Sequence, residues 1–277
     1  MVMSPVLEQF PADVVGGEKL KVFSTTRQGG VSEGNYASFN INCYCGDRPE
    51  TVAVNRRLLA EELGVEVENI IMPHQTHGTE VRFISKDFLT LPPSTRDTLL
   101  EGVDAVFTDL PMVCVGVSTA DCIPIVLYDP CNHLVCAVHA GWRGTVHRIV
   151  AKSIKMMDKP YRVSPASLYA WIGPGITLDA FEVGEEVYQQ FASAGFDMNA
   201  IARRYPSDSS SESDGRKWHI DLMECNRRQL VESGLKESHI YVSGICTYNN
   251  ADRYFSARRL GIDSGRIYTG AVMYPSV

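Results

Sequence analysis

The stretch CNHLVCAVHAGWRG, residues 131–144, decides how we expect this chain to fold around a site. Its apolar run 134–138 predicts a buried β-strand, which leads directly into His139. Glycines follow at 141 and 144, where the backbone turns before a helix-like pattern begins. The pattern predicts an imidazole at the end of a strand, beside backbone that leaves room for a ligand.

Two more metal-ligating or nucleophilic side chains stand in similar settings upstream. His77 lies in MPHQTHGTEV (72–81) and Cys122 in STADCIPIVLYD (118–129). A catalytic zinc site uses three protein ligands and leaves the fourth position for water or substrate. His77, Cys122 and His139 would supply two nitrogens and one sulfur from separate segments. The same atoms also suit a Cys122 nucleophile activated by His139, so this alternative stays open.

Composition limits the class of protein. With 277 residues, 44% of them hydrophobic and 21% charged, the chain is long enough to bury a sizeable core. A net charge of −7 without a basic patch argues against a nucleic-acid partner. No apolar run approaches the roughly 20 residues that span a bilayer, and no secretory signal is recognisable. The eight cysteines are too sparse for a disulfide scaffold, so we expect a cytoplasmic protein with reduced thiols and no membrane partner.

The pattern of elements predicts an α+β fold, with mixed β-sheets and flanking helices in a single compact domain over 1–277. Strands are predicted at 20–26, 103–108, 112–117, 123–128, 134–138, 167–172, 240–248 and 266–273, and helices at 51–63 (ended by Gly64), 145–157 and 218–233. Since the strands between 103 and 139 have no helix between them, we expect an antiparallel meander there. Residues 85–101 predict a surface excursion, and 204–216 predict a surface loop.

Several segments, in this order, resemble those of one known family. They are QTHGTEV (75–81), DAVFTD (104–109), STADCIPIVLYD (118–129), AVHAGWRGT (137–145), WIGPGI (171–176), FEVGEEV (181–187) and FSARRLGIDSGR (255–266). The chain resembles the YfiH-like family, also called multicopper polyphenol oxidoreductase or laccase-domain proteins. The resemblance runs from about Thr25 to Arg266 and implies a compact α+β fold. It also implies a zinc ion held by His77, Cys122 and His139, with Cys122 and His139 taking part in catalysis.

Further site residues rest on weaker signals. The segment 25–47 resembles the first motif of the family, and this resemblance implies that Asn40 and Arg56 lie near the substrate. Arg143 follows His139 in its turn and is a candidate to bind an anion, although a structural role with loop carbonyls is the alternative. The chain departs from the family's pattern at Tyr44, where the family usually has a histidine.

The family's activities imply a purine nucleoside phosphorylase that cleaves adenosine, inosine, guanosine or methylthioadenosine with phosphate, together with adenosine deaminase activity. The implied partners are a small-molecule nucleoside and phosphate, and we expect a monomer or homodimer. Copper is less suitable than zinc, because seven histidines are too few for multicopper polyphenol oxidase chemistry. A cysteine hydrolase that edits peptidoglycan precursors is a further alternative, and so is a non-enzymatic interaction protein.

Overall fold

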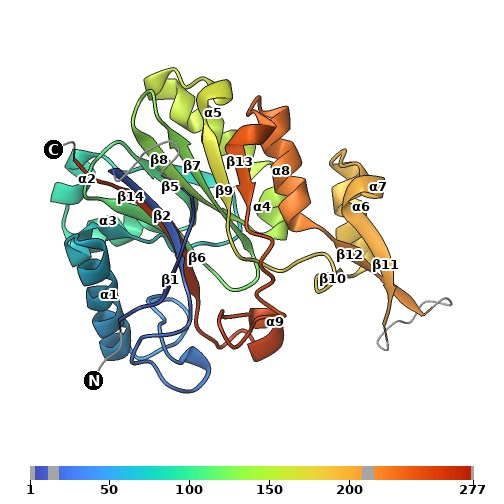
Figure 1. Cartoon of the computed structure of the whole chain (residues 1–277), viewed down its shortest axis with the longest axis horizontal. Helices are drawn as coiled ribbons and strands as arrows, with labels where there is room; N and C mark the ends of the chain where they lie inside the picture. The colour runs from blue at the N-terminus through green and yellow to red at the C-terminus, as the bar shows by residue number, and fades with distance from the viewer. Residues whose placement is uncertain (1–3, 12–18, 208–214, 276–277) are drawn as a thin grey trace.

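Two large β-sheets lie face to face in this computed structural model, which describes residues 4–11, 19–207 and 215–275 (Figure 1). Within these residues, the first sheet has five strands in the order β1 (Leu7–Gln9), β2 (Leu20–Thr25), β14 (Ile267–Met273), β6 (Cys114–Thr119) and β3 (Ile70–Ile71). The second has six strands in the order β13 (Ile240–Val242), β9 (Tyr169–Ile172), β7 (Ile123–Asp129), β8 (Leu134–Ala140), β5 (Val103–Thr108) and β4 (Glu80–Phe83).

Both sheets are mixed. The pairs β3–β6, β4–β5 and β9–β13 are parallel, whereas the remaining pairs within the two sheets are antiparallel. This arrangement, with helices on the outer faces, confirms the predicted α+β fold with mixed sheets. None of the helices in the described residues is long and apolar enough to cross a bilayer.

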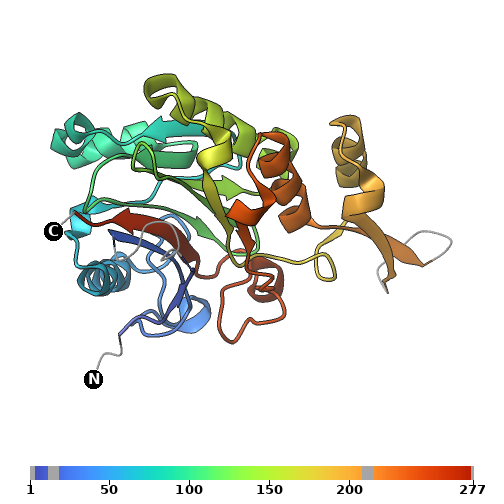
Figure 2. The ribbon, with the colours of Figure 1, turned by 45° about the horizontal axis from the view of Figure 1, so that its top comes forward.

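The apolar core fills three layers, and Figure 2 shows the sheets stacked between helices. Between the two sheets, valines of β5, β7 and β8 meet valines of β6, including Val106, Val126, Val135, Val115 and Val117. Helix α1 (Pro49–Leu63) packs on the outer face of the five-stranded sheet, while α5 (Ile149–Tyr161) and α8 (Leu222–Glu232) pack on the outer face of the six-stranded sheet. Each sheet is thus covered on both faces, which is why β5 to β8 are buried along their whole length.

The predicted meander is correct only in part. Strands β7 and β8 do form an antiparallel hairpin, from Ile123 opposite Ala140 to Asp129 opposite Leu134. However, β5 and β6 lie in different sheets, because β5 pairs with β4 and β8 while β6 pairs with β3 and β14. The chain crosses between the sheets before β6 and again before β7. Strands with apolar residues on both faces carry no alternation, so their sequence does not show which sheet they join.

The helix bounds predicted from the sequence agree only in part with those of the structure. Helix α1 ends as predicted at Gly64, which has a left-handed φ of 65°. The predicted helix 145–157 is two helices, α4 (Trp142–Val146) and α5, separated where Arg148 takes a φ of 60°. The predicted helix 218–233 begins only at Leu222, where the Asp221 side chain caps it by accepting a hydrogen bond from the backbone amide of Glu224.

The predicted surface excursion 85–101 consists of two short helices. They are α2 (Lys86–Thr90), capped by Ser85, and α3 (Pro93–Leu100), which starts with proline. Buried Phe88 and Leu100 attach them to the core between the sheets. The short helix α9 (Ala257–Leu260) and 3₁₀ turns at Gly34–Tyr36, Val67–Asn69, Pro165–Ser167 and Glu237–His239 complete the large body.

A small third sheet protrudes from this body, at the right of Figure 1. Its described strands are β10 (Glu182–Val183), β12 (Arg216–Ile220) and β11 (Ala202–Pro206), accompanied by α6 (Glu185–Ser193) and α7 (Met198–Ile201). Strands β11 and β12 occupy both ends of the predicted loop 204–216, so that prediction was wrong there, and 208–214 lie outside the described residues. Strand β13 is also shorter than the predicted strand 240–248.

Candidate metal centre

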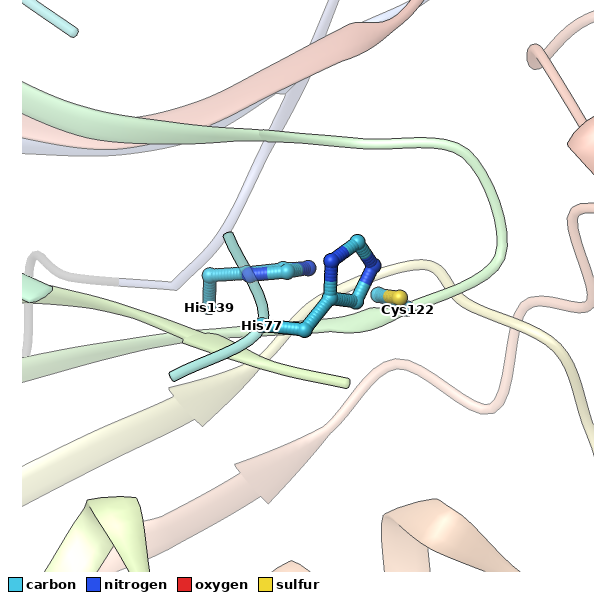
Figure 3. Close-up of side chains that lie close together, drawn as sticks. All are labelled: His77, Cys122 and His139. Carbon is cyan, nitrogen blue, oxygen red and sulfur yellow. The ribbon is translucent and has the colours of Figure 1, made fainter. Parts of the chain in front are cut away.

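His77, Cys122 and His139 come together at one end of the two large sheets, and their ring nitrogens and sulfur point toward one another (Figure 3). One ligand atom from each lies within 4.8 Å of the others. His77 is in the loop between β3 and β4, Cys122 is in the crossing from β6 to β7, and His139 is near the end of β8. The structure therefore brings together the three residues from which the sequence predicts a metal site.

The strand register explains this convergence. Strand β8 lies between β5 and β7 in the sheet. Because Ala105 pairs with Val138, the antiparallel register puts Asp104 opposite His139. Cys122 immediately precedes β7. Because Ile123 pairs with Ala140, Cys122 lies beside the end of β8. Neighbouring strands thus bring a carboxylate and a thiol to either side of the same imidazole.

Asp104 is the group that orients two of the three proposed ligands. Its carboxylate accepts a hydrogen bond of 2.7 Å from Nδ1 of His139, which leaves Nε2 free to face the cluster. It also accepts the backbone amides of Thr76, His77 and Gly78, at 3.3, 3.0 and 2.7 Å. Burial alone raises the pKa of Asp104, but the hydrogen bonds from His139 and these amides outweigh it and hold the pKa below its usual value.

Asp104 was not among the site residues predicted from the sequence. The signal was present, because a single carboxylate occurs inside the strand VDAVFT (103–108), whose other residues up to Phe107 are apolar. Asp104 is fully buried, and a buried carboxylate requires several donors around it. Such a residue indicates a fixed hydrogen-bonding role even where its partners cannot be read from the sequence.

Two residues of the centre have backbone in the left-handed region, which is unusual for residues other than glycine. His77 has a φ of 63° and Asp121 a φ of 91°. The Asp121 carboxylate accepts hydrogen bonds of 2.7 Å from the Thr247 hydroxyl and from the backbone amide of Arg258. Conformations of this kind persist only where surrounding contacts hold them, and they concentrate at functional sites. Here they set the directions in which the His77 and Cys122 side chains leave the chain.

The three side chains shift one another's protonation. Burial raises the pKa of Cys122, but the charge of His139 and hydrogen bonds from both histidines outweigh it and lower the pKa. Burial lowers the pKa of His139, but the charge of Cys122 and the hydrogen bond to Asp104 outweigh it and raise the pKa. Both shifts favour a thiolate at Cys122. A thiolate is required for a metal ligand and also for a cysteine nucleophile, so electrostatics is compatible with both hypotheses.

A cavity of about 300 Å³ opens beside the cluster. Its described lining contains three histidines and one arginine but no carboxylate: Asn42, Tyr44, Cys45, His74, Gln75, His77, Ser118, Thr119, Ala120, Cys122, His139, Ala257, Ile262 and Arg266. Gly141 leaves space at the cluster, because a Cβ there would lie 3.0 Å from Cδ2 of His77 and 3.1 Å from Sγ of Cys122. Two imidazoles and a thiolate next to an open cavity fit the donor set of a three-ligand zinc site.

The other predicted site residues do not line this cavity. Asn40 is fully buried, donates to the Asp47 carboxylate and accepts a hydrogen bond from the backbone amide of Arg266. Arg56 lines a neighbouring cavity of about 340 Å³ and donates to the carbonyl of Ile70 at 2.8 Å. Arg143 is exposed and lies over the ring of Trp142, 4.4 Å from its centroid. Five polar side chains that do line the cavity were not predicted from the sequence: Asn42, Gln75, Ser118, Thr119 and Arg266.

A two-sheet α+β fold with two histidines and a cysteine beside a cavity defines a candidate metal-dependent enzyme. The comparison with protein families makes the class specific. Residues 21–274 match the model of the multi-copper polyphenol oxidoreductase laccase family, and the chain belongs to that family. This confirms the resemblance inferred from the motifs.

Characterised and solved relatives agree with this membership. The chain is 46% identical over 252 residues to a purine nucleoside phosphorylase of Bacteroides thetaiotaomicron, covering 91% of each chain. It is 40% identical over 253 residues to adenosine deaminase RL5 of an unknown prokaryotic organism, covering 91% of this chain and 94% of the relative. The crystal structure of the hypothetical protein YfiH of Bacillus licheniformis superposes with a TM-score of 0.82 at 27% identity, covering 92% and 93% of the two chains. The names of the first two are those of nucleoside-processing enzymes, which places this chain among enzymes.

Proposed function

We propose that this protein is a zinc-dependent purine nucleoside phosphorylase. The substrates would be adenosine, inosine, guanosine or methylthioadenosine, and the products a free purine and a sugar 1-phosphate. The observation that carries the proposal is the meeting of three donor atoms within 4.8 Å at the wall of a cavity of about 300 Å³. A cavity of that size suits a small-molecule ligand. The 46% identity to a purine nucleoside phosphorylase supports the choice of reaction.

The chain's own residues would bind and orient the reactants. His77, Cys122 and His139 would hold the zinc ion, and Asp104 would fix the His139 ring. When bound, Zn²⁺ supplies Lewis-acid chemistry, which can stabilise negative charge as it develops on a reactant. In the reaction, a phosphate oxygen bonds to the anomeric carbon as the carbon–nitrogen bond breaks, and the purine leaves with the electron pair and takes up a proton. Polar side chains in the cavity wall would position the nucleoside.

Adenosine deamination is a second candidate at the same centre. It is favoured by the 40% identity to adenosine deaminase RL5. In this reaction water adds to the purine carbon that carries the amino group, and ammonia leaves. The two activities are separable, because deamination releases ammonia without phosphate, whereas phosphorolysis releases the free base only when phosphate is present.

The proposal is tested with protein purified without added metal. We expect about one zinc ion per chain, as in single-ion sites with three protein ligands, and hypoxanthine release from inosine only with phosphate. Cys122→Ala and His139→Ala should lose both the zinc and the activity. Cys136→Ala is the matched control, because Cys136 is a buried thiol of β8 outside the three-ligand cluster. Full activity in either ligand variant would contradict the proposal.

The two remaining enzymatic alternatives predict different results in the same preparation. Stoichiometric copper with oxidation of phenols would favour a polyphenol oxidase, as the family's description suggests. A cysteine hydrolase acting on peptidoglycan precursors would keep its activity in EDTA and lose it on alkylation of Cys122. The proposed phosphorylase should instead lose its activity in EDTA and regain it when zinc is restored.

A further inference from the structure

Arg266 brings a positive charge into the cavity beside the three-ligand cluster. Among the described residues that line this cavity, no other lysine or arginine is present. The guanidinium is anchored by the carbonyls of its own loop, with Nη1 donating to Ser264 and Gly265 at 2.6 and 3.0 Å and Nη2 donating to Ile262 at 2.9 Å. These bonds use carbonyls rather than a carboxylate, and no ion pair with another described residue neutralises the charge of Arg266.

Asn40 holds the backbone at this arginine. Its Oδ1 accepts a hydrogen bond of 3.1 Å from the amide of Arg266, while its Nδ2 donates to Asp47 at 2.9 Å. Asn40 is fully buried, which prevents direct contact with a ligand in the cavity. The residue that the sequence placed near the substrate therefore positions Arg266, which lines the cavity itself.

Thr119 supplies a second, independent observation. It lines the same cavity and is 2% exposed, and its hydroxyl has no hydrogen-bond partner among the described residues. A buried hydroxyl without a partner is unfavourable, so a ligand atom that bonds it is favoured. Thr119 lies opposite Ile267 in the antiparallel pair of β6 and β14, and Arg266 directly precedes Ile267 in the chain. The charge and the unpartnered hydroxyl thus lie on neighbouring chain segments.

The surrounding wall favours an anion. It contains no aspartate or glutamate among its described residues, so no carboxylate that lines it would repel an anion. A phosphate oxygen can accept hydrogen bonds from a guanidinium and a hydroxyl together, and charge-assisted bonds of this kind are strong. We propose that Arg266 and Thr119 form the subsite that binds inorganic phosphate next to the three-ligand cluster. This inference rests on the proposed phosphorolysis and names the residues that would select its second substrate.

The test measures the two substrates separately. Arg266→Gln should raise the KM for phosphate about tenfold or more, since charge-assisted hydrogen bonds are worth about 1.5–3 kcal/mol, whereas the KM for inosine should change little. Thr119→Val should raise the KM for phosphate by roughly threefold to tenfold, because a neutral hydrogen bond is worth less. Arg259→Gln is the matched control, because Arg259 is an exposed arginine of the preceding helix and lies over Tyr248. Zinc content should be the same in all these variants.

Direct binding of inorganic phosphate, measured by calorimetry, separates this inference from the proposed function. If the wild-type protein binds phosphate and Arg266→Gln weakens that binding about tenfold, the subsite stands even where no phosphorolysis is found. An unchanged phosphate affinity and KM in folded Arg266→Gln would overturn the subsite and leave the proposed function intact. If Arg266→Gln does not fold, the phosphate affinity and the KM for phosphate are compared with the wild type in Arg266→Lys and Thr119→Val instead. A wild-type protein that does not bind phosphate at all would also overturn the inference.

Discussion

Asp104 is the residue on which the geometry of the proposed centre most depends. One carboxylate accepts four hydrogen bonds, three from the backbone of the His77 loop and one from the His139 ring. Because a carboxylate has only acceptor sites, it can satisfy all four donors at once. An amide at this position would place its own N–H groups against backbone N–H groups. Position 104 therefore requires a carboxylate, whereas burial in a strand alone would also allow an apolar residue.

We predict that Asp104→Asn weakens zinc binding by about tenfold to a hundredfold, as is usual when a residue that orients a ligand is changed. The reason is that asparagine keeps only one acceptor oxygen and turns an NH2 group toward other donors, either the backbone amides of the His77 loop or Nδ1 of His139, so the loop and the His139 ring would no longer be held together. Competition with a chromophoric chelator measures the affinity. Asp129→Asn is the control, because Asp129 is also fully buried but caps the turn of the β7–β8 hairpin. It should lower stability without changing zinc affinity; equal losses of zinc affinity in both variants would refute this role of Asp104.

A second residue-scale prediction concerns the space at Gly141. Its φ of −66° suits any residue, so alanine there would introduce no backbone strain. The new Cβ would, however, lie 3.0 Å from the His77 ring and 3.1 Å from the Cys122 sulfur, and one of these side chains would have to move. Gly141→Ala should therefore lose zinc affinity while its thermal unfolding without metal stays close to that of the wild type. Unchanged zinc affinity would show that the ligands do not occupy these positions when the metal is bound.

At the scale of elements, the positions of single strands and helices were predicted better from the sequence than the pairing of the strands into sheets. The strand before His139 and the helix ending at Gly64 were correct because each has a local signal, an apolar run or a left-handed glycine. The separation of β5 from β6 was missed because both strands are buried throughout and give no alternating pattern. The three proposed ligands were found from their chemical type and motifs. Arg266 and Thr119 were missed because only the pairing of β14 with β6 brings their two chain segments together.

Helix α8 offers a prediction about pH. Glu224 accepts hydrogen bonds from Arg227 and Arg228, and the bond from Arg227 is the main cause that lowers its pKa. Since the folded-state pKa is depressed, the stabilisation is fully present above the ordinary value of 4.5 and is lost as the pH falls through the folded-state value.

Glu224→Gln should thus lower the free energy of unfolding at pH 7 by up to about 1 kcal/mol, as expected for a largely solvent-screened pair. At pH 3 the difference from the wild type should be smaller, and urea unfolding at both values measures it. Glu232→Gln, which removes a more exposed partner of Arg148, should have a smaller effect at pH 7. If the loss of unfolding free energy in Glu224→Gln grew as the pH fell, a lowered pKa of Glu224 in the folded state would be contradicted.

At the scale of the whole molecule, the proposed centre lies where the chain passes between the two large sheets. His77 is in the loop that leads from β3 of the five-stranded sheet to β4 of the six-stranded sheet. Cys122 is in the crossing from β6 to β7, which joins the same two sheets. His139 belongs to β8 in the six-stranded sheet. An ion bound to all three would therefore link two sheet-to-sheet connections to a central strand.

This arrangement predicts that metal removal destabilises the whole fold. Ligand that binds only the folded chain at a thousandfold excess over its Kd adds about 4 kcal/mol, and for a chain of this size each kcal/mol shifts the Tm by roughly 2–4 °C. Chelation should lower the wild-type Tm accordingly, and hydrogen exchange should increase in the connections around His77 and Cys122. Cys122→Ala should show the same Tm with and without chelator. If chelation abolishes activity but leaves the wild-type Tm unchanged, the metal is bound too weakly to join the sheets, and its role is confined to the reaction.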